Sequence, residues 1–66
     1  MTNYIEFEEV EVVAVSSKGN AVMLRIDGED EWIPFSQIED NGEDFKVGNT
    51  FPKIYLTQWI CEQKGL

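Results

Sequence analysis

Residues 28–38, with the sequence GEDEWIPFSQI, are the most informative stretch for the fold, because a run of carboxylates is followed there directly by an apolar segment. The glycine follows Asp27, and an Asp-Gly pair favours a tight turn between two strands, since glycine tolerates positive φ. The turn leads into a short predicted strand at residues 31–33. Pro34 lacks an amide hydrogen, so it either ends this strand or confines it to a sheet edge.

One helical turn is predicted directly after this proline. Its apolar members, Phe35 and Ile38, are three residues apart, which brings their side chains to one face. We expect Trp32, Ile33 and Ile38 to point into the core, because a chain this small has few other large side chains with which to fill it. Replacing Trp32 by alanine is then expected to cost about 3–5 kcal/mol.

Towards the N-terminus, residues 4–15 predict one long strand. Apolar and charged residues alternate with a period of two until the phase slips at Glu8 and Glu9, which is typical of a bulge or a sharp bend. Residues 16–20, SSKGN, predict a turn, and residues 21–26 predict the returning strand. These segments should form a hairpin.

Towards the C-terminus, residues 51–56 predict a further strand, and Pro52 near its start is again typical of a sheet edge. Thr57 is suited to cap a short helix at residues 58–64, which Gly65 would end. Together these elements predict a mainly β domain: a small OB- or SH3-like antiparallel β-barrel with a short C-terminal helix.

Two resemblances bear on this fold. From residue 21 to residue 56, the strands and the turns FSQI (residues 35–38) and KVGN (residues 46–49) resemble an OB-type RNA-binding repeat of the ribosomal kind, which implies a small barrel. The block WIPFSQI and the ending QWICEQKGL are similar to small uncharacterised proteins of phages and bacterial mobile elements. That resemblance implies a phage-type accessory protein and no particular reaction. Phe35 stands where the phage pattern has a basic residue, which weakens any inferred nucleic-acid contact.

The composition fits one small acidic domain over residues 1–66. The hydrophobic fraction of 42% is too high for a disordered tail, while 13 acidic and 5 basic side chains give a net charge of -8. Affinity for phosphate comes mainly from Lys and Arg, so direct binding to DNA or RNA is disfavoured. The longest apolar run, residues 12–15, is far short of the about 20 residues of a membrane span, and no membrane contact is expected.

The cellular location follows from the cysteine count and the N-terminus. Cys61 is the only cysteine and cannot form an internal disulfide, whereas small secreted domains usually carry several. The first residues do not show a basic segment followed by an apolar one, as a secretion signal would. We therefore expect a reducing cytoplasm, which for a phage-type protein is that of the host.

Most catalytic chemistry is disfavoured. The chain has no histidine, and Cys61 has no base near it in sequence, so we expect a buried, inert thiol. Asp27, Glu29 and Asp30 do not match EF-hand spacing and are expected to form a solvated acidic turn, with a weak divalent site at most. The prediction is a protein that is not an enzyme and needs no cofactor and no metal.

The main electrostatic feature is a group of acids with no Lys or Arg among them, here called the acidic set. Its members are Asp27, Glu29, Asp30, Glu31, Glu39, Asp40, Glu43 and Asp44. A smaller acidic group precedes it and consists of Glu6, Glu8, Glu9 and Glu11. Repulsion within such a set destabilises the compact state, and folding does not require it.

Two interpretations of the acidic set are open. It is consistent with ordinary solvation, or with a negative surface that docks on a basic groove of a nucleic-acid-handling protein in place of phosphates. In a phage-type protein, docking would make the chain a DNA-mimicking inhibitor of a host defence or DNA-processing complex. Reversing Glu29, Asp30 and Glu31 to lysine should then leave a folded protein that has lost its partner.

Two alternatives come from other classes of protein. The first is an OB-like nucleic-acid-binding module that uses Lys18, Arg25, Lys46 and Lys53. The second is a structural subunit of an oligomer, whose size the sequence does not indicate.

The aromatic residues Trp59, Phe35 and Phe51 are predicted as core, and Tyr55 as a possible exposed contact.

Overall fold

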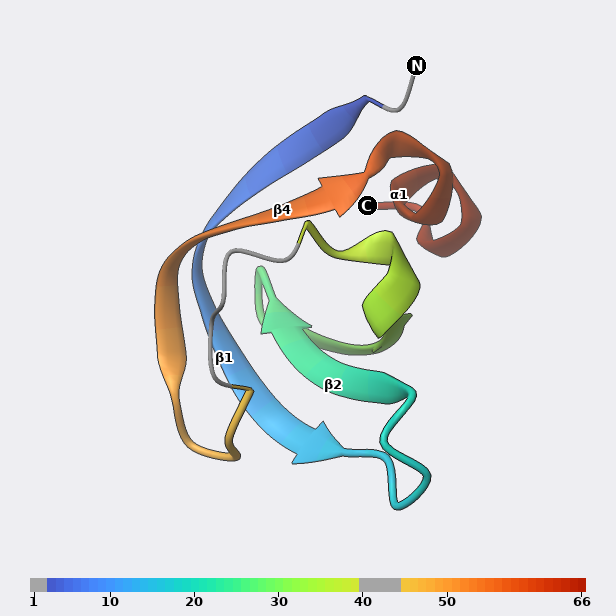
Figure 1. Ribbon diagram of the computed structural model, residues 1–66. Helices are drawn as coiled ribbons and strands as arrows, with labels where there is room; N and C mark the ends of the chain where they lie inside the picture. Colours follow the sequence, from blue (N-terminus) through green and yellow to red (C-terminus); the bar gives the residue numbers. More distant parts are fainter. Residues whose placement is uncertain (1–2, 40–44) are drawn as a thin grey trace.

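The computed structural model describes residues 3–39 and 45–66 of the chain. Its elements, in chain order, are strands β1 (Tyr4–Val15), β2 (Ala21–Ile26) and β3 (Glu29–Pro34), the 3-10 turn η1 (Phe35–Gln37), strand β4 (Thr50–Thr57) and helix α1 (Gln58–Lys64). The strands form one antiparallel sheet in the order β3-β2-β1-β4 (Figure 1). The predicted class, mainly β with a C-terminal helix, is confirmed.

The prediction of a closed barrel is wrong. Strands β3 and β4 are the two edges of an open sheet, as the positions of Pro34 and Pro52 suggested. Directly after η1, the chain returns to β4 through an isolated bridge between Ile38 and Leu56 and a 2.9 Å hydrogen bond from the amide of Glu39 to the carbonyl oxygen of Tyr55. Proline cannot donate the hydrogen bond that would continue the ladder, so β3 ends before it can close the sheet.

The predicted bend in β1 is confirmed at Glu9, whose φ is 54°. The register against β4 continues through the bend, with Glu8 opposite Lys53 and Val10 opposite Phe51, so no residue is inserted there. The ribbon of β1 and β4 curls together (Figure 1). The irregularity in register lies instead between Val12 and Ala14, against β2, where the sequence pattern did not indicate it.

The two predicted hairpins are present. Asp27 and Gly28 form a two-residue connection in which both residues have positive φ, 52° and 81°, as a type I′ turn requires. The turn between β1 and β2 is closed by a 2.9 Å hydrogen bond from the amide of Ser16 to the carbonyl oxygen of Ala21. Strand β3 is longer than predicted, because its pairing with β2 begins directly after the Asp-Gly turn.

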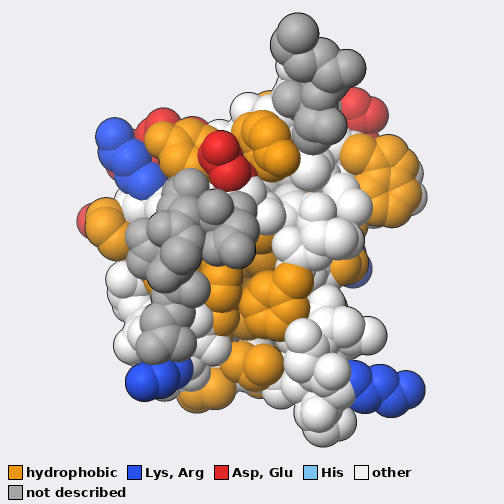
Figure 2. All heavy atoms as spheres, viewed as in Figure 1, with side chains coloured by type: hydrophobic (Ala, Val, Ile, Leu, Met, Phe, Trp, Pro, Cys, Tyr) orange, Lys and Arg blue, Asp and Glu red, His pale blue; other side chains and the backbone are white. Residues whose placement is uncertain are grey.

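The core consists mainly of aliphatic side chains on the inner face of the curled sheet. Its buried members are Val10, Val12, Val22, Leu24, Ile26, Ile33, Ile38, Phe51, Ile54, Leu56, Ile60 and Cys61. Burial of Ile33, Ile38 and Phe51 confirms the prediction. Phe35 is half-buried and stacks edge-on against Phe45 with ring centroids 5.3 Å apart. Hydrophobic side chains reach the surface near the middle of the face seen in Figure 2.

The prediction that both tryptophans lie in the core is wrong. Trp32 is 42% exposed and Trp59 is 58% exposed. Successive side chains of a strand point to opposite faces, so Trp32 points outward because its neighbour Ile33 points into the core. Trp59 lies in the first turn of α1, and the helix buries Ile60 and Cys61 instead.

Helix α1 has the predicted bounds and the predicted caps. The Thr57 hydroxyl accepts a 3.2 Å hydrogen bond from the amide of Ile60, and Gly65 takes the left-handed conformation at the C-terminal end. The thiol of Cys61 is buried, and this burial raises its pKa. No helix in the described ranges combines the length and hydropathy needed to cross a membrane.

Candidate functional site

The pleat of β3 divides the predicted acidic set between two faces of the sheet. Asp30 is opposite Arg25 on the outer face, whereas Glu29 and Glu31 alternate with it and stand on the inner side of this edge strand. A single docking surface made from Glu29, Asp30 and Glu31 is therefore not what the fold provides. The sequence run is continuous, but the strand conformation separates its side chains.

Glu31 and Glu39, two further described acids of the set, also lie apart from each other. Glu31 lies beside Lys64 of α1, with 4.0 Å between Oε2 and Nζ. Glu39 is exposed after η1, and its amide is bound to β4. Asp40, Glu43 and Asp44 lie outside the described residues.

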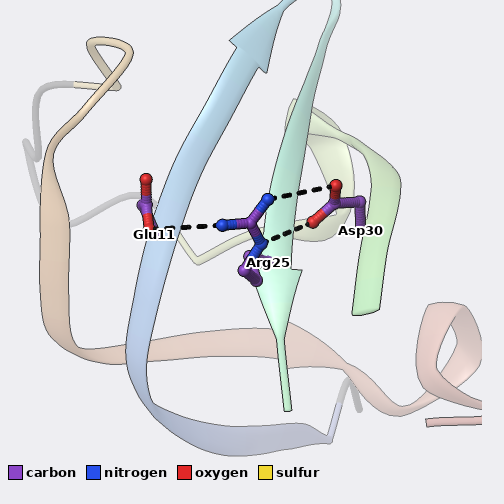
Figure 3. A network of polar contacts seen from close by, with 3 residues as sticks. All are labelled: Glu11, Arg25 and Asp30. Atoms are coloured by element: carbon purple, nitrogen blue, oxygen red, sulfur yellow. Dashed lines mark hydrogen bonds and ion pairs between the residues drawn. The ribbon is translucent and has the colours of Figure 1, made fainter. Parts of the chain in front are cut away.

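A charged row crosses the outer face of the sheet at Glu11, Arg25 and Asp30, one residue from each of β1, β2 and β3 (Figure 3). The guanidinium of Arg25 donates to Asp30 through Nε at 2.9 Å and Nη2 at 3.4 Å, and Nη1 lies 3.8 Å from Glu11 Oε1. The bond to Asp30, and then the charges of Asp30 and Glu11, raise the pKa of Arg25. Because all three side chains are exposed, the row adds little stability.

Beside this row lies a depression of about 710 Å³, here called the acidic hollow. Its lining residues come from the bend in β1, the Asp-Gly turn and the start of β4: Glu8, Glu9, Glu11, Arg25, Asp27, Gly28, Thr50 and Pro52. The hollow combines Asp27 of the acidic set with three acids of the smaller N-terminal group. Sequence reasoning treated these groups separately, although the predicted hairpin already implied that β1 approaches the Asp-Gly turn.

An apolar row runs parallel to the charged row on the same outer face. It consists of Ala14, Met23 and Trp32, which are neighbours across β1, β2 and β3. Helix α1 packs against β4 and β1 and adds its buried residues to the inner core, so it does not cover this row. The outer face thus presents an exposed indole beside carboxylates.

The basic residues of the alternative nucleic-acid site are not gathered in the same way. Lys18 lies in the turn between β1 and β2, and Lys53 is opposite Glu8 on β4. Arg25 stands between two carboxylates. Lys46 is exposed and precedes β4. The carboxylates on both sides of Arg25 offset its positive charge, which lowers its attraction for phosphate.

The other reactive groups among the described residues, Cys61 and Tyr55, do not form a catalytic centre. Cys61 is 5% exposed and has a raised pKa, so its thiolate is scarce. Tyr55 is half-buried, and its hydroxyl donates a 3.2 Å hydrogen bond to Glu6, which raises the pKa of the tyrosine. Within residues 3–39 and 45–66, no three acidic or cysteine side chains are grouped so that they could hold a metal ion.

Comparisons of the chain with protein-family models, with curated proteins and with solved structures found no match.

Proposed function

We propose that this protein is a non-catalytic protein-binding module that docks its outer face on a basic surface of a nucleic-acid-handling protein. The observation that supports the proposal is that the acidic hollow and the exposed indole of Trp32 lie on the same outer face of the sheet, on either side of the charged row, and that α1 packs elsewhere. In a phage-type protein this docking would block a host defence or DNA-processing complex, because the carboxylates would occupy sites for phosphate.

The two parts of the face have different roles in this proposal. Exposed carboxylates steer a basic partner and accelerate association, but they contribute modestly to affinity because water and salt screen them. Aromatic side chains that become buried at the centre of an interface supply most of the binding energy. Glu8, Glu9 and Asp27 therefore attract the partner, and Trp32 with Met23 holds it.

The decisive experiment compares two double charge reversals. Glu8→Lys with Glu9→Lys changes the acidic hollow, whereas Glu29→Lys with Glu39→Lys makes the same change in net charge at exposed acids outside it. Each immobilised protein is exposed to the same host lysate, and retained proteins are eluted with excess duplex DNA or with rising salt.

The proposal expects that one lysate protein is retained by the wild type and by the Glu29/Glu39 variant. The Glu8/Glu9 variant should not retain it, and duplex DNA should displace it. Equal loss in both variants would mean that net charge alone retains the protein, and would refute a located surface.

Direct titration with labelled DNA and RNA checks the nucleic-acid-binding alternative. We expect no binding tighter than about 10⁻⁴ M at low salt, the weak end of non-specific affinities.

A further inference from the structure

A second hollow, of about 450 Å³, lies where the start of β1, the turn η1 and the junction of β4 with α1 meet. It shares no lining residue with the acidic hollow. Its sides include two exposed aromatic residues, Tyr4 at 44% and Trp59 at 58% exposure. We call it the aromatic hollow. Large aromatic side chains left in water around a concave site point to a ligand.

The sheet register and the helix geometry build this hollow. Tyr4 is opposite Thr57 across β1 and β4, so the tyrosine lies beside the N-cap of α1. Trp59 follows the cap, and Glu62 is three residues further along the helix, which brings the indole and the carboxylate to one side. In Figure 1 the N-terminal end of β1 and helix α1 lie close to each other.

Hydrogen bonds hold the polar side chains of the hollow in place. Asn3 Nδ2 donates to Gln58 Oε1 at 3.2 Å, and Gln58 Nε2 donates to Glu62 Oε1 at 3.2 Å. The Thr57 hydroxyl donates to Gln37 Oε1 at 2.6 Å, which ties η1 to the start of the helix. A ligand therefore meets an ordered site, and less conformational entropy is lost on binding.

The charges of the hollow favour a cation. Among the described residues that line it, Glu62 is the charged one, and none is Lys or Arg. The faces of tryptophan and tyrosine attract cations, and the chain carries a net charge of -8. A guanidinium suits the site best, because it stacks flat on an aromatic ring while its N–H groups donate to carboxylate and amide oxygens. An ammonium group presents a compact charge without this planar match.

We propose that the aromatic hollow binds an arginine side chain of a basic peptide segment, with the guanidinium between Tyr4 and Trp59 and bonded to Glu62. This inference does not depend on the proposed function, because a small arginine probe tests it without any partner protein. A failure here would leave the outer-face proposal intact, and the reverse also holds.

The test is a titration of the ¹⁵N-labelled protein with N-acetyl-arginine amide, followed by NMR. The indole N–H of Trp59 and the side-chain amides of Asn3 and Gln58 should shift in a saturable way, while the indole N–H of Trp32 serves as an internal control. The citrulline analogue has the same shape but a neutral urea, and it should bind about tenfold more weakly, the factor that a cation–π contact of moderate strength provides. The lysine analogue should be intermediate.

Two matched variants separate a located contact from general attraction. Glu62→Gln should weaken arginine binding about tenfold, because it removes the charge and can keep the bond from Gln58. Glu39→Gln removes the same charge outside the hollow and should change binding less than about twofold. Equal binding of arginine and citrulline, equal effects of the two variants, or shifts centred on Trp32 would each overturn the proposal.

Discussion

The two faces of the strand pair β2 and β3 differ sharply, although their residues alternate along the same chain. The inner face carries Val22, Leu24 and Ile33, all fully buried, and the outer face at the same level carries Met23 and the exposed Trp32. The comparison shows that medium-sized aliphatic residues fill this small core. The larger indoles are thus left at the surface, where they are available for contacts.

The largest effect is expected when a buried aliphatic side chain is removed. Leu24→Ala should destabilise the protein by about 2–5 kcal/mol, because the residue has no exposure and its loss leaves a cavity. Small domains have little more than this in total stability, so much of the variant should be unfolded. Urea denaturation followed by circular dichroism measures the change. A loss below that of an outer-face variant would contradict the assignment of the core.

The second test asks whether α1 is anchored to the inner side through its cap. Thr57→Ala removes the N-cap hydrogen bond to Ile60 and the bond to Gln37, and should cost about 1–2 kcal/mol in the free energy of unfolding. Thr57→Ser keeps the hydroxyl and should restore most of the loss. Thr50→Ala, at the exposed start of β4, is the matched control. Equal losses for the two alanine variants would argue against the cap.

The third test concerns the outer face itself. Trp32→Thr keeps a strand-forming residue and removes the cross-strand contact with Met23, which should cost about 1 kcal/mol or less. This replaces the much larger loss predicted from sequence, when Trp32 was assigned to the core. Urea denaturation of this variant and of Leu24→Ala under the same conditions compares the two losses in the free energy of unfolding. A loss as large as that of the leucine variant would mean that the indole supports the fold.

The smallest effect is a pH dependence on the inner side. Burial raises the pKa of Cys61 above its ordinary value of 9.0, so the folded state disfavours the thiolate. The stability that the protonated thiol contributes to the folded state is therefore fully present below the ordinary pKa. It is lost as the pH rises from the ordinary pKa towards the raised pKa of the folded state. The stability of the wild type should fall more steeply above pH 9.0 than that of Cys61→Ala. Thermal melting at several pH values compares the slopes; parallel slopes would contradict this.

The elements of this fold could be predicted from sequence where neighbouring residues decide the outcome. The Asp27-Gly28 turn follows from the tolerance of these residue types for positive φ. The bounds of α1 follow from a threonine hydroxyl that bonds an amide three residues on and a glycine that ends the helix. The phase slip at Glu8 and Glu9 marked a real bend. In each case the cause lies within a few residues of its effect.

The candidate surfaces could not be predicted in the same way, because they depend on register and bending between distant segments. The acidic hollow needs the bend in β1 to lie beside the Asp27 turn, and the aromatic hollow needs Tyr4 to lie opposite Thr57. The outward position of Trp32 depends on the phase of β3 relative to a core already filled by aliphatic residues. The sequence alone determined local turns, caps and a mainly β chain. Tertiary structure decided which side chains meet, since the pairing of strands places each residue on one face or the other.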